Sequence, residues 1–135
     1  MELISTLEKE IKEMESELRK KGVIAIILFG SLARGNASST SDVDIAVLFR
    51  RGLEPNADWI YQELQKTLRK EVNLVILNEA PPRIRFSALK GKVLYLSDEK
   101  EFVHFMARTY DNWADLEHLR RIIWRYAERW VTVGG

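Results

Sequence analysis

Apolar side chains recur at three- and four-residue steps along the first part of the chain. They are Leu3, Leu7, Ile11, Met14 and Leu18. This spacing places them on one stripe of an α-helix, so residues 3–21 are predicted to form an amphipathic helix. Gly22 follows where a helix end favours a residue that can adopt left-handed backbone angles.

Continuous apolar runs follow this helix. Residues 23–29 (VIAIILF) are rich in β-branched side chains, which predicts a strand covered on both faces, and Gly30 ends it. Small and polar residues at 30–41 predict a loop. The apolar pattern returns at 42–49 (DVDIAVLF), which predicts a second strand, with a turn at 50–55.

The remainder of the chain alternates between helix and strand patterns. Asn56 is a predicted cap for a helix over 57–70, and 71–77 is a predicted third strand. Two adjacent prolines favour the start of a short helix within 81–89, because proline suits the first turn. A short fourth strand is predicted at 92–96.

Ser97 begins a capping signature, since acidic residues follow it at 99 and 101. It predicts a long C-terminal helix from 98 to about 130, either continuous or broken near 110–112. The whole pattern indicates an α+β (mixed α/β) fold with one sheet of about four strands flanked by helices. At 135 residues, the chain is expected to form a single domain over 1–135.

Composition narrows the classes of function. Lys and Arg number 21 against 20 Asp and Glu, so the near-neutral charge gives no electrostatic reason to expect direct nucleic-acid binding. The absence of cysteine excludes disulfides and thiolate metal sites. The charged N-terminus lacks the apolar core of a signal peptide, and the longest apolar run is too short to cross a membrane. We therefore expect a cytoplasmic protein with no membrane association.

Candidate chemistry lies between the first two strands. Gly30-Ser31 is followed, after ten residues, by Asp42-Val43-Asp44. Because strand side chains alternate between faces, Asp42 and Asp44 are expected to project to the same side. Two close carboxylates repel unless a cation lies between them, and Mg²⁺ or Mn²⁺ is the natural counter-charge. The Gly-Ser turn offers backbone N–H groups and a hydroxyl to phosphates, so the combination points to nucleotidyl transfer.

A purely structural explanation has to be weighed against this one. Gly-Ser turns are common, and so are aspartates at the start of strands. Average composition predicts this combination at this spacing in about one chain in several hundred. The Gly-Ser pair also follows an apolar strand and the aspartates open another, which favours the functional interpretation.

These residues resemble the signature of the minimal nucleotidyltransferase (MNT) branch of the DNA polymerase β-like superfamily. Similar features extend over nearly the whole chain, including Arg34-Gly35, the segment 77–82 and Tyr110-Asp111. The resemblance implies the polymerase β-like nucleotidyltransferase fold, with a small mixed sheet. It also implies a partner, because MNT proteins are encoded beside HEPN-domain proteins in toxin–antitoxin systems.

Site roles follow from the resemblance residue by residue. Gly30 and Ser31 would bind the nucleotide triphosphate, with Arg34 near a phosphate, while Asp42 and Asp44 would be the catalytic, metal-binding pair. Related enzymes place a third carboxylate on a neighbouring strand, where this chain has Asn73. An asparagine can offer an oxygen to a metal but cannot take a proton. Glu71, two residues earlier, either substitutes in part or is a solvated charge.

The resemblance implies an enzymatic antitoxin. Such a protein would be a Mg²⁺-dependent adenylyltransferase that moves AMP from ATP to a tyrosine of a HEPN RNase toxin, releasing pyrophosphate. The alternative is a nucleotide-binding antitoxin or regulatory subunit that inhibits the HEPN partner by contact, with catalysis weakened at Asn73. An enzyme that modifies small molecules is disfavoured, because such enzymes usually carry a further helical domain.

Overall fold

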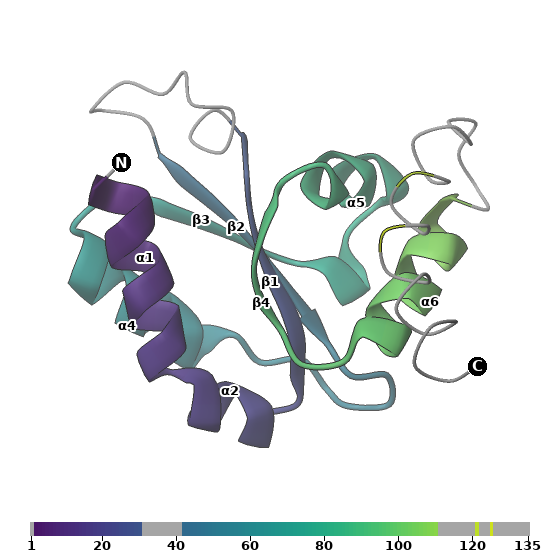
Figure 1. Ribbon diagram of the computed structural model, residues 1–135, viewed down its shortest axis with the longest axis horizontal. Helices are drawn as coiled ribbons and strands as arrows, with labels where there is room; N and C mark the ends of the chain where they lie inside the picture. The colour runs from purple at the N-terminus through teal and green to yellow at the C-terminus, as the bar shows by residue number, and fades with distance from the viewer. Residues whose placement is uncertain (1, 31–41, 111–120, 122–124, 126–135) are drawn as a thin grey trace.

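The computed structural model describes residues 2–30, 42–110, 121 and 125, and Figure 1 shows the arrangement of their helices and strands. In chain order the elements are α1 (Glu2–Glu13), α2 (Glu15–Lys20), β1 (Val23–Phe29), β2 (Val43–Phe49), α4 (Asp58–Leu68), β3 (Val72–Ile76), the 3-10 turn η1 (Leu77–Glu79), α5 (Pro82–Leu89), β4 (Lys92–Leu96) and α6 (Glu99–Tyr110).

The four strands form one mixed sheet in the order β3-β2-β1-β4. Strand β1 is antiparallel to β2 and β4, whereas β2 and β3 are parallel. A parallel pair needs a crossover connection, and α4 supplies it. The predicted α+β class, with about four strands in one small mixed sheet flanked by helices, is therefore confirmed.

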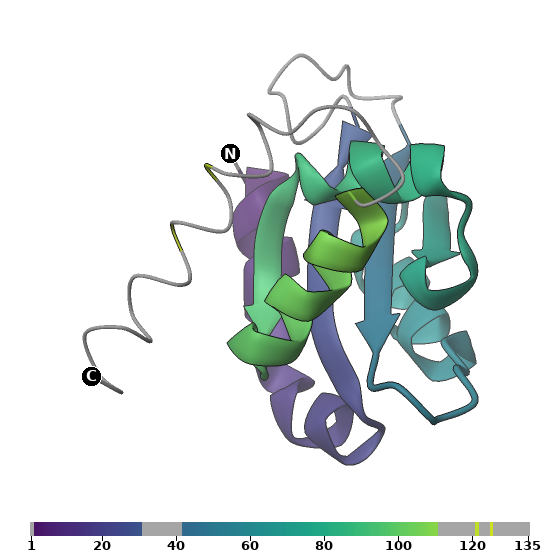
Figure 2. The ribbon, with the colours of Figure 1, turned by 90° about the vertical axis from the view of Figure 1, so that its right-hand side faces the viewer.

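Helices cover the sheet on both faces. Figure 1 shows α1, α2 and α4 on one side and α5 and α6 on the other, and Figure 2 shows α6 lying across the sheet. Each face carries its own apolar core, with Leu7, Ile11 and Leu64 in one and Phe86, Phe102 and Met106 in the other. Six of the seven β1 residues are buried, which confirms the predicted strand covered on both faces.

The predicted apolar stripe of the N-terminal segment is confirmed, but the prediction of one continuous helix over 3–21 is wrong. The helix divides at Met14, whose N–H lies 3.1 Å from the carbonyl oxygens of both Glu10 and Ile11. The stripe survives because Leu7, Ile11 and Leu18 are 0–1% exposed on either side of the division. Gly22 has a φ of +77°, as its predicted place after a helix requires.

The predicted cap of the last helix is wrong by one residue. Asp98 Oδ1 accepts the Glu101 N–H at 3.0 Å, whereas Ser97 Oγ donates to the Val23 carbonyl at 2.8 Å. Ser97 therefore ties the end of β4 to β1, and Asp98 caps α6. Asp98 Oδ2 also accepts from Arg50 Nη1 at 3.2 Å. The predicted continuation from 111 to about 130 lies outside the described residues, apart from Arg121 and Arg125.

Asp98→Ala is expected to lower the free energy of unfolding by about 1 kcal/mol at pH 7, as loss of a helix cap does. The Glu101 N–H, helped by Arg50, lowers the pKa of Asp98, although burial opposes the shift. The stabilisation is therefore present above the unfolded pKa of about 3.9 and is lost as the pH falls through the folded value. Urea unfolding should show the difference from wild type shrinking as the pH falls below about 4.

Asp58→Ala is the matched control, because Asp58 is an exposed acidic residue in the first turn of α4. Its loss removes only a favourable interaction with the helix dipole, so a smaller effect is expected. Equal effects of the two substitutions at pH 7 would contradict the capping role of Asp98.

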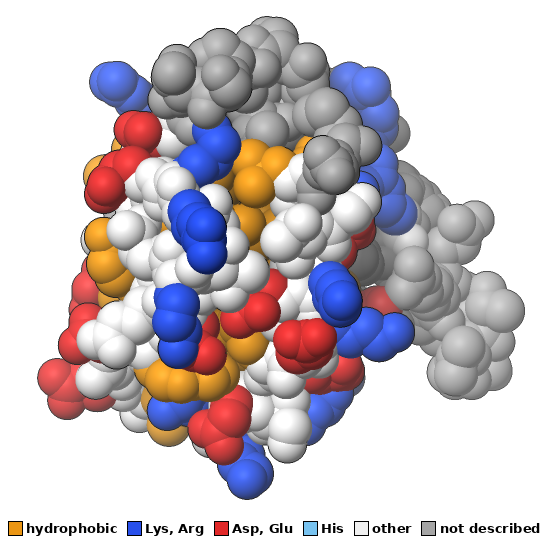
Figure 3. Space-filling view, turned by 90° about the vertical axis from the view of Figure 1, so that its left-hand side faces the viewer, with side chains coloured by type: hydrophobic (Ala, Val, Ile, Leu, Met, Phe, Trp, Pro, Cys, Tyr) orange, Lys and Arg blue, Asp and Glu red, His pale blue; other side chains and the backbone are white. Residues whose placement is uncertain are grey.

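On the α1 and α4 side of the molecule, the described residues show no concentration of one charge. Figure 3 shows basic and acidic side chains interspersed over that face. This distribution agrees with the near-neutral composition. Among the described residues, no helix is long and apolar enough to cross a membrane.

Candidate functional site

Three strands bring the predicted residues to one end of the sheet. Gly30 follows the end of β1, Asp42 and Asp44 lie at the start of β2, and Asn73 lies near the start of β3. The antiparallel register pairs Phe29 with Asp44, and the parallel register pairs Asp44 with Asn73. Residues separated from Asp44 by 15 and 29 positions in the sequence therefore become its direct neighbours.

Strand alternation determines the face to which Asp44 projects. Ala46 and Leu48 belong to the core beneath α5 and α6, whereas Val43 and Ile45 belong to the opposite core. Asp44 shares the parity of Ala46, so its side chain projects to the α5 and α6 face. Asp44 is half-buried and Asp42 is exposed, which leaves the pair open to a ligand at the sheet end.

The Asn73 amide joins the two aspartates. Its Nδ2 lies 3.2 Å from Asp42 Oδ2 and 3.1 Å from Asp44 Oδ1. Ionised carboxylates only accept hydrogen bonds, so the NH₂ group is the end of the amide that can face both. The structure thus confirms that Asp42 and Asp44 project to the same side and that Asn73 is their neighbour on the next strand.

Gly30 has two physical reasons to be glycine. Its φ is +78°, in the left-handed region that disfavours side chains. A Cβ built on Gly30 would also collide with the Asp44 carboxylate oxygen Oδ2. Gly30 therefore allows the Asp44 carboxylate to lie directly against the turn that ends β1.

The remaining predicted residues divide into two groups. Glu71 is exposed, and its backbone carbonyl accepts the Val43 N–H at 2.9 Å. No hydrogen bond or ion pair within the described ranges connects the Glu71 side chain to the aspartates. Ser31 and Arg34 lie outside the described residues.

The donor set fits a hard divalent cation. Mg²⁺ is usually bound through one or two carboxylates together with phosphate and water oxygens, and Asp42 and Asp44 supply two carboxylates on one side. The amide of Asn73 would have to turn for its oxygen to become a third donor. The parts of the chain that the structure describes hold no cluster of three or more His, Cys, Asp or Glu residues suited to a metal.

Known proteins with similar sequences include two from Methanocaldococcus jannaschii whose names propose protein adenylyltransferase activity. One is 27% identical over 95 residues, which cover 70% of this chain and 73% of the relative. The other is 35% identical over 77 residues, which cover 56% of this chain and 83% of the relative.

Solved structures of similar fold come from toxin–antitoxin complexes. A toxin–antitoxin structure with AMP-PNP contains a chain that is 29% identical, with a TM-score of 0.64, and the match covers 86% of this chain and 94% of that one. A complex of tri-AMPylated Shewanella oneidensis HEPN toxin with MNT antitoxin contains a chain that is 27% identical, with a TM-score of 0.56 and coverage of 84% and 92%.

The polymerase beta nucleotidyltransferase family matches residues 9–100, a range that holds both candidate aspartates and the whole sheet. The family match, the fold and the carboxylate pair agree. The chain therefore belongs to the polymerase beta nucleotidyltransferase family.

Proposed function

We propose that this chain is a Mg²⁺-dependent adenylyltransferase antitoxin that transfers AMP from ATP to a tyrosine hydroxyl of a HEPN toxin. The observation that carries the proposal is the placement of Asp42 and Asp44 on one face, with Asp44 directly against Gly30. Support for the acceptor comes from the similarity to an MNT antitoxin in complex with an AMPylated HEPN toxin. The AMP-PNP complex supports an adenine nucleotide as donor.

The reaction forms a bond between the acceptor oxygen and the α-phosphorus of ATP and breaks the bond to the β-phosphate, releasing pyrophosphate. Asp42 and Asp44 would hold the cation, whose charge stabilises the α-phosphate and the leaving group. Gly30, together with Ser31 and Arg34, would hold the triphosphate. The Asn73 amide cannot accept the hydroxyl proton, so a carboxylate of the site or water must take it.

Asn73 also supports the alternative function, inhibition of the HEPN partner by binding without modification. Its NH₂ group donates to Asp42 Oδ2 and Asp44 Oδ1, so one oxygen of each carboxylate that would hold a cation already accepts a hydrogen bond. A cation held through these two oxygens would compete with the Asn73 donor. A site of this kind could bind nucleotide while transferring AMP slowly.

The distinguishing measurement is the intact mass of the HEPN-domain partner after co-expression with this chain. AMP-sized increments with the wild type, absent with the Asp42→Asn/Asp44→Asn variant, are expected if the chain modifies its partner. An unmodified partner that still co-purifies would establish the binding alternative instead.

Asn73→Asp is expected to make the thermal stability of the protein more sensitive to divalent metal ions. Three carboxylates would then face one another without the two hydrogen bonds that Asn73 donates, so repulsion should lower the Tm in EDTA by about 3 °C or more. Added Mn²⁺ should raise the Tm of this variant more than that of wild type. Differential scanning fluorimetry measures both effects.

Asn73→Ala is the control, because it removes the hydrogen bonds without adding a charge. It should lower the Tm in EDTA without enlarging the response to Mn²⁺. An equal Mn²⁺ response in wild type and Asn73→Asp would contradict the position of residue 73 beside the metal site.

A further inference from the structure

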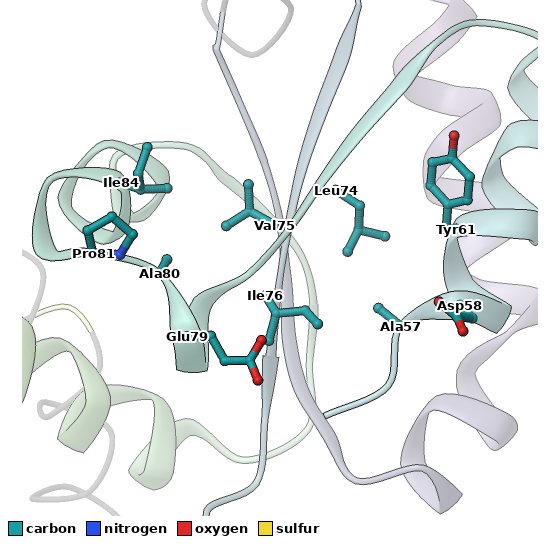
Figure 4. Close-up of a pocket in the computed structure, with 10 residues that line it drawn as sticks. All are labelled: Ala57, Asp58, Tyr61, Leu74, Val75, Ile76, Glu79, Ala80, Pro81 and Ile84. Carbon is teal, nitrogen blue, oxygen red and sulfur yellow. The ribbon is translucent and has the colours of Figure 1, made fainter. Parts of the chain in front are cut away.

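A groove of about 570 Å³ runs along the outer edge of β3. Neither Asp42 nor Asp44 lines it. Figure 4 shows β3 side chains at its centre, α4 side chains on one side, and side chains from η1 and α5 on the other. Its lining is Ala57, Asp58, Tyr61, Leu74, Val75, Ile76, Glu79, Ala80, Pro81 and Ile84.

The backbone along this groove has unused hydrogen-bonding capacity. Among the described residues β3 pairs with β2 alone, so one edge of β3 is open. The Val72 N–H at that edge is occupied by Gln65 Oε1 at 2.7 Å. Because backbone groups alternate along a strand, the next N–H groups that face outward are those of Leu74 and Ile76.

The side chains of the groove are apolar at the centre and acidic at one end. Leu53 and Tyr61 are the large apolar side chains that the described part of the chain leaves exposed, and Tyr61, at 36%, lines this groove. Asp58 and Glu79 are exposed carboxylates from opposite sides of β3, and Figure 4 shows Glu79 beside Ile76 and Asp58 across from it, next to Ala57. No ion pair within the described residues neutralises either of them. The groove thus fits an apolar segment that carries a basic residue.

The other end of the groove meets the candidate site. Leu74 directly follows Asn73, whose amide contacts Asp42 and Asp44. At about 3.3 Å per residue, the strand from Asn73 to Ile76 spans roughly 10 Å. A segment of four or five extended residues along β3 would therefore reach from the acidic end to the carboxylate pair.

We propose that this groove binds the acceptor protein. An extended segment of that protein pairs with the outer edge of β3 through the backbone groups of Leu74 and Ile76. It places apolar side chains beside Tyr61 and a Lys or Arg beside Asp58 and Glu79. Main-chain pairing of this kind supplies affinity while pockets for alternate side chains supply specificity. The segment delivers its hydroxyl-bearing residue to Asp42 and Asp44, so the inference rests on the proposed protein adenylyltransferase function.

Charge neutralisation tests the acidic end. With the HEPN-domain partner as acceptor, Asp58→Asn/Glu79→Gln is expected to raise the KM about tenfold while kcat changes less than twofold, and high salt should reduce the difference. Glu13→Gln/Glu15→Gln is the matched control. This variant also removes two negative charges, and Glu15 lies in the first turn of α2 as Asp58 lies in the first turn of α4. Because both residues lie away from the groove, the KM should not change.

Hydrogen exchange tests the backbone pairing independently of activity. In the full chain bound to the HEPN-domain partner, the Leu74 and Ile76 amides should exchange at least tenfold more slowly than in the free chain. The Val72 amide, already bonded to Gln65, should change little. Tyr61→Arg, which introduces a charge at an exposed position in the groove, should weaken this protection without lowering the Tm.

Two results would overturn the proposal. One is efficient AMP transfer to the partner with no protection at Leu74 and Ile76. The other is protection of these amides in the free chain at rising concentration, with a dimer in light scattering that Tyr61→Arg removes, since the occupant would then be a second copy. Failure of the proposed function is separate: the partner would bind and protect the β3 edge but gain no AMP.

Discussion

The variant Asp42→Asn/Asp44→Asn is expected to lose AMP transfer by about a thousandfold or more. Both substitutions remove the negative charge that would hold a divalent cation, and with it the charge stabilisation of the phosphates. The fold should tolerate the change, because Asp42 is exposed, Asp44 is half-buried and an amide oxygen can still accept from Asn73. The measurement is the rate of AMP incorporation into the HEPN-domain partner at saturating ATP and Mg²⁺.

The thermal unfolding of this variant is its necessary control. A Tm in EDTA within a few degrees of wild type, with unchanged circular dichroism, would show that the loss is chemical rather than structural. Transfer that remains above a tenth of the wild-type rate would contradict the assignment of the aspartates as the metal-binding pair.

Gly30→Ala is expected to reduce AMP transfer by about a hundredfold, the scale of a misplacement of about 1 Å at a reacting centre. The new Cβ would collide with Asp44 Oδ2 and displace that carboxylate from its neighbours. The variant should also lose about 1–3 kcal/mol of stability, because alanine is strained at a φ of +78°. Transfer kinetics and urea unfolding measure the two effects.

Gly52→Ala separates the effect of backbone strain from the effect of the collision with Asp44. Gly52 has a similar φ of +88°, but a Cβ there would meet no atom within 4 Å. This substitution should therefore cost stability through backbone strain and leave AMP transfer unchanged. Equal transfer rates for Gly30→Ala and Gly52→Ala would contradict the idea that Gly30 makes room for the Asp44 carboxylate.

Local patterns predicted most of the described elements. The fourth strand was expected at 92–96 and is Lys92–Leu96, and the helix expected within 81–89 is Pro82–Leu89. Both depend on short-range causes: β-branched and aromatic side chains in the strand, and proline at the first helical turn. The predicted helix 57–70 and the strands 42–49 and 71–77 differ from the structure by one or two residues at their ends, and two further errors concern the helix division and the helix cap. The division at Met14 and the cap at Asp98 depend on contacts that sequence spacing does not specify.

The candidate site was only partly accessible from sequence. The spacing of Gly30 and the two aspartates identified the carboxylate pair, and strand periodicity predicted its shared face. The Asn73 bridge required the parallel register of β2 and β3, which brings residues 29 positions apart into contact. The groove was missed altogether, because its lining comes from α4, β3, η1 and α5 and no single segment carries its pattern.

By itself, the sequence determined the fold class and most of the elements and predicted the carboxylate pair, because hydrophobic periodicity and residue spacing act over a few residues. The strand order β3-β2-β1-β4 decided the rest. It placed Asn73 next to both aspartates and, within the described part of the chain, left β3 with an open edge beside the site. Strand pairing depends on how helices on both faces share one buried core, and that is a property of the whole packed domain.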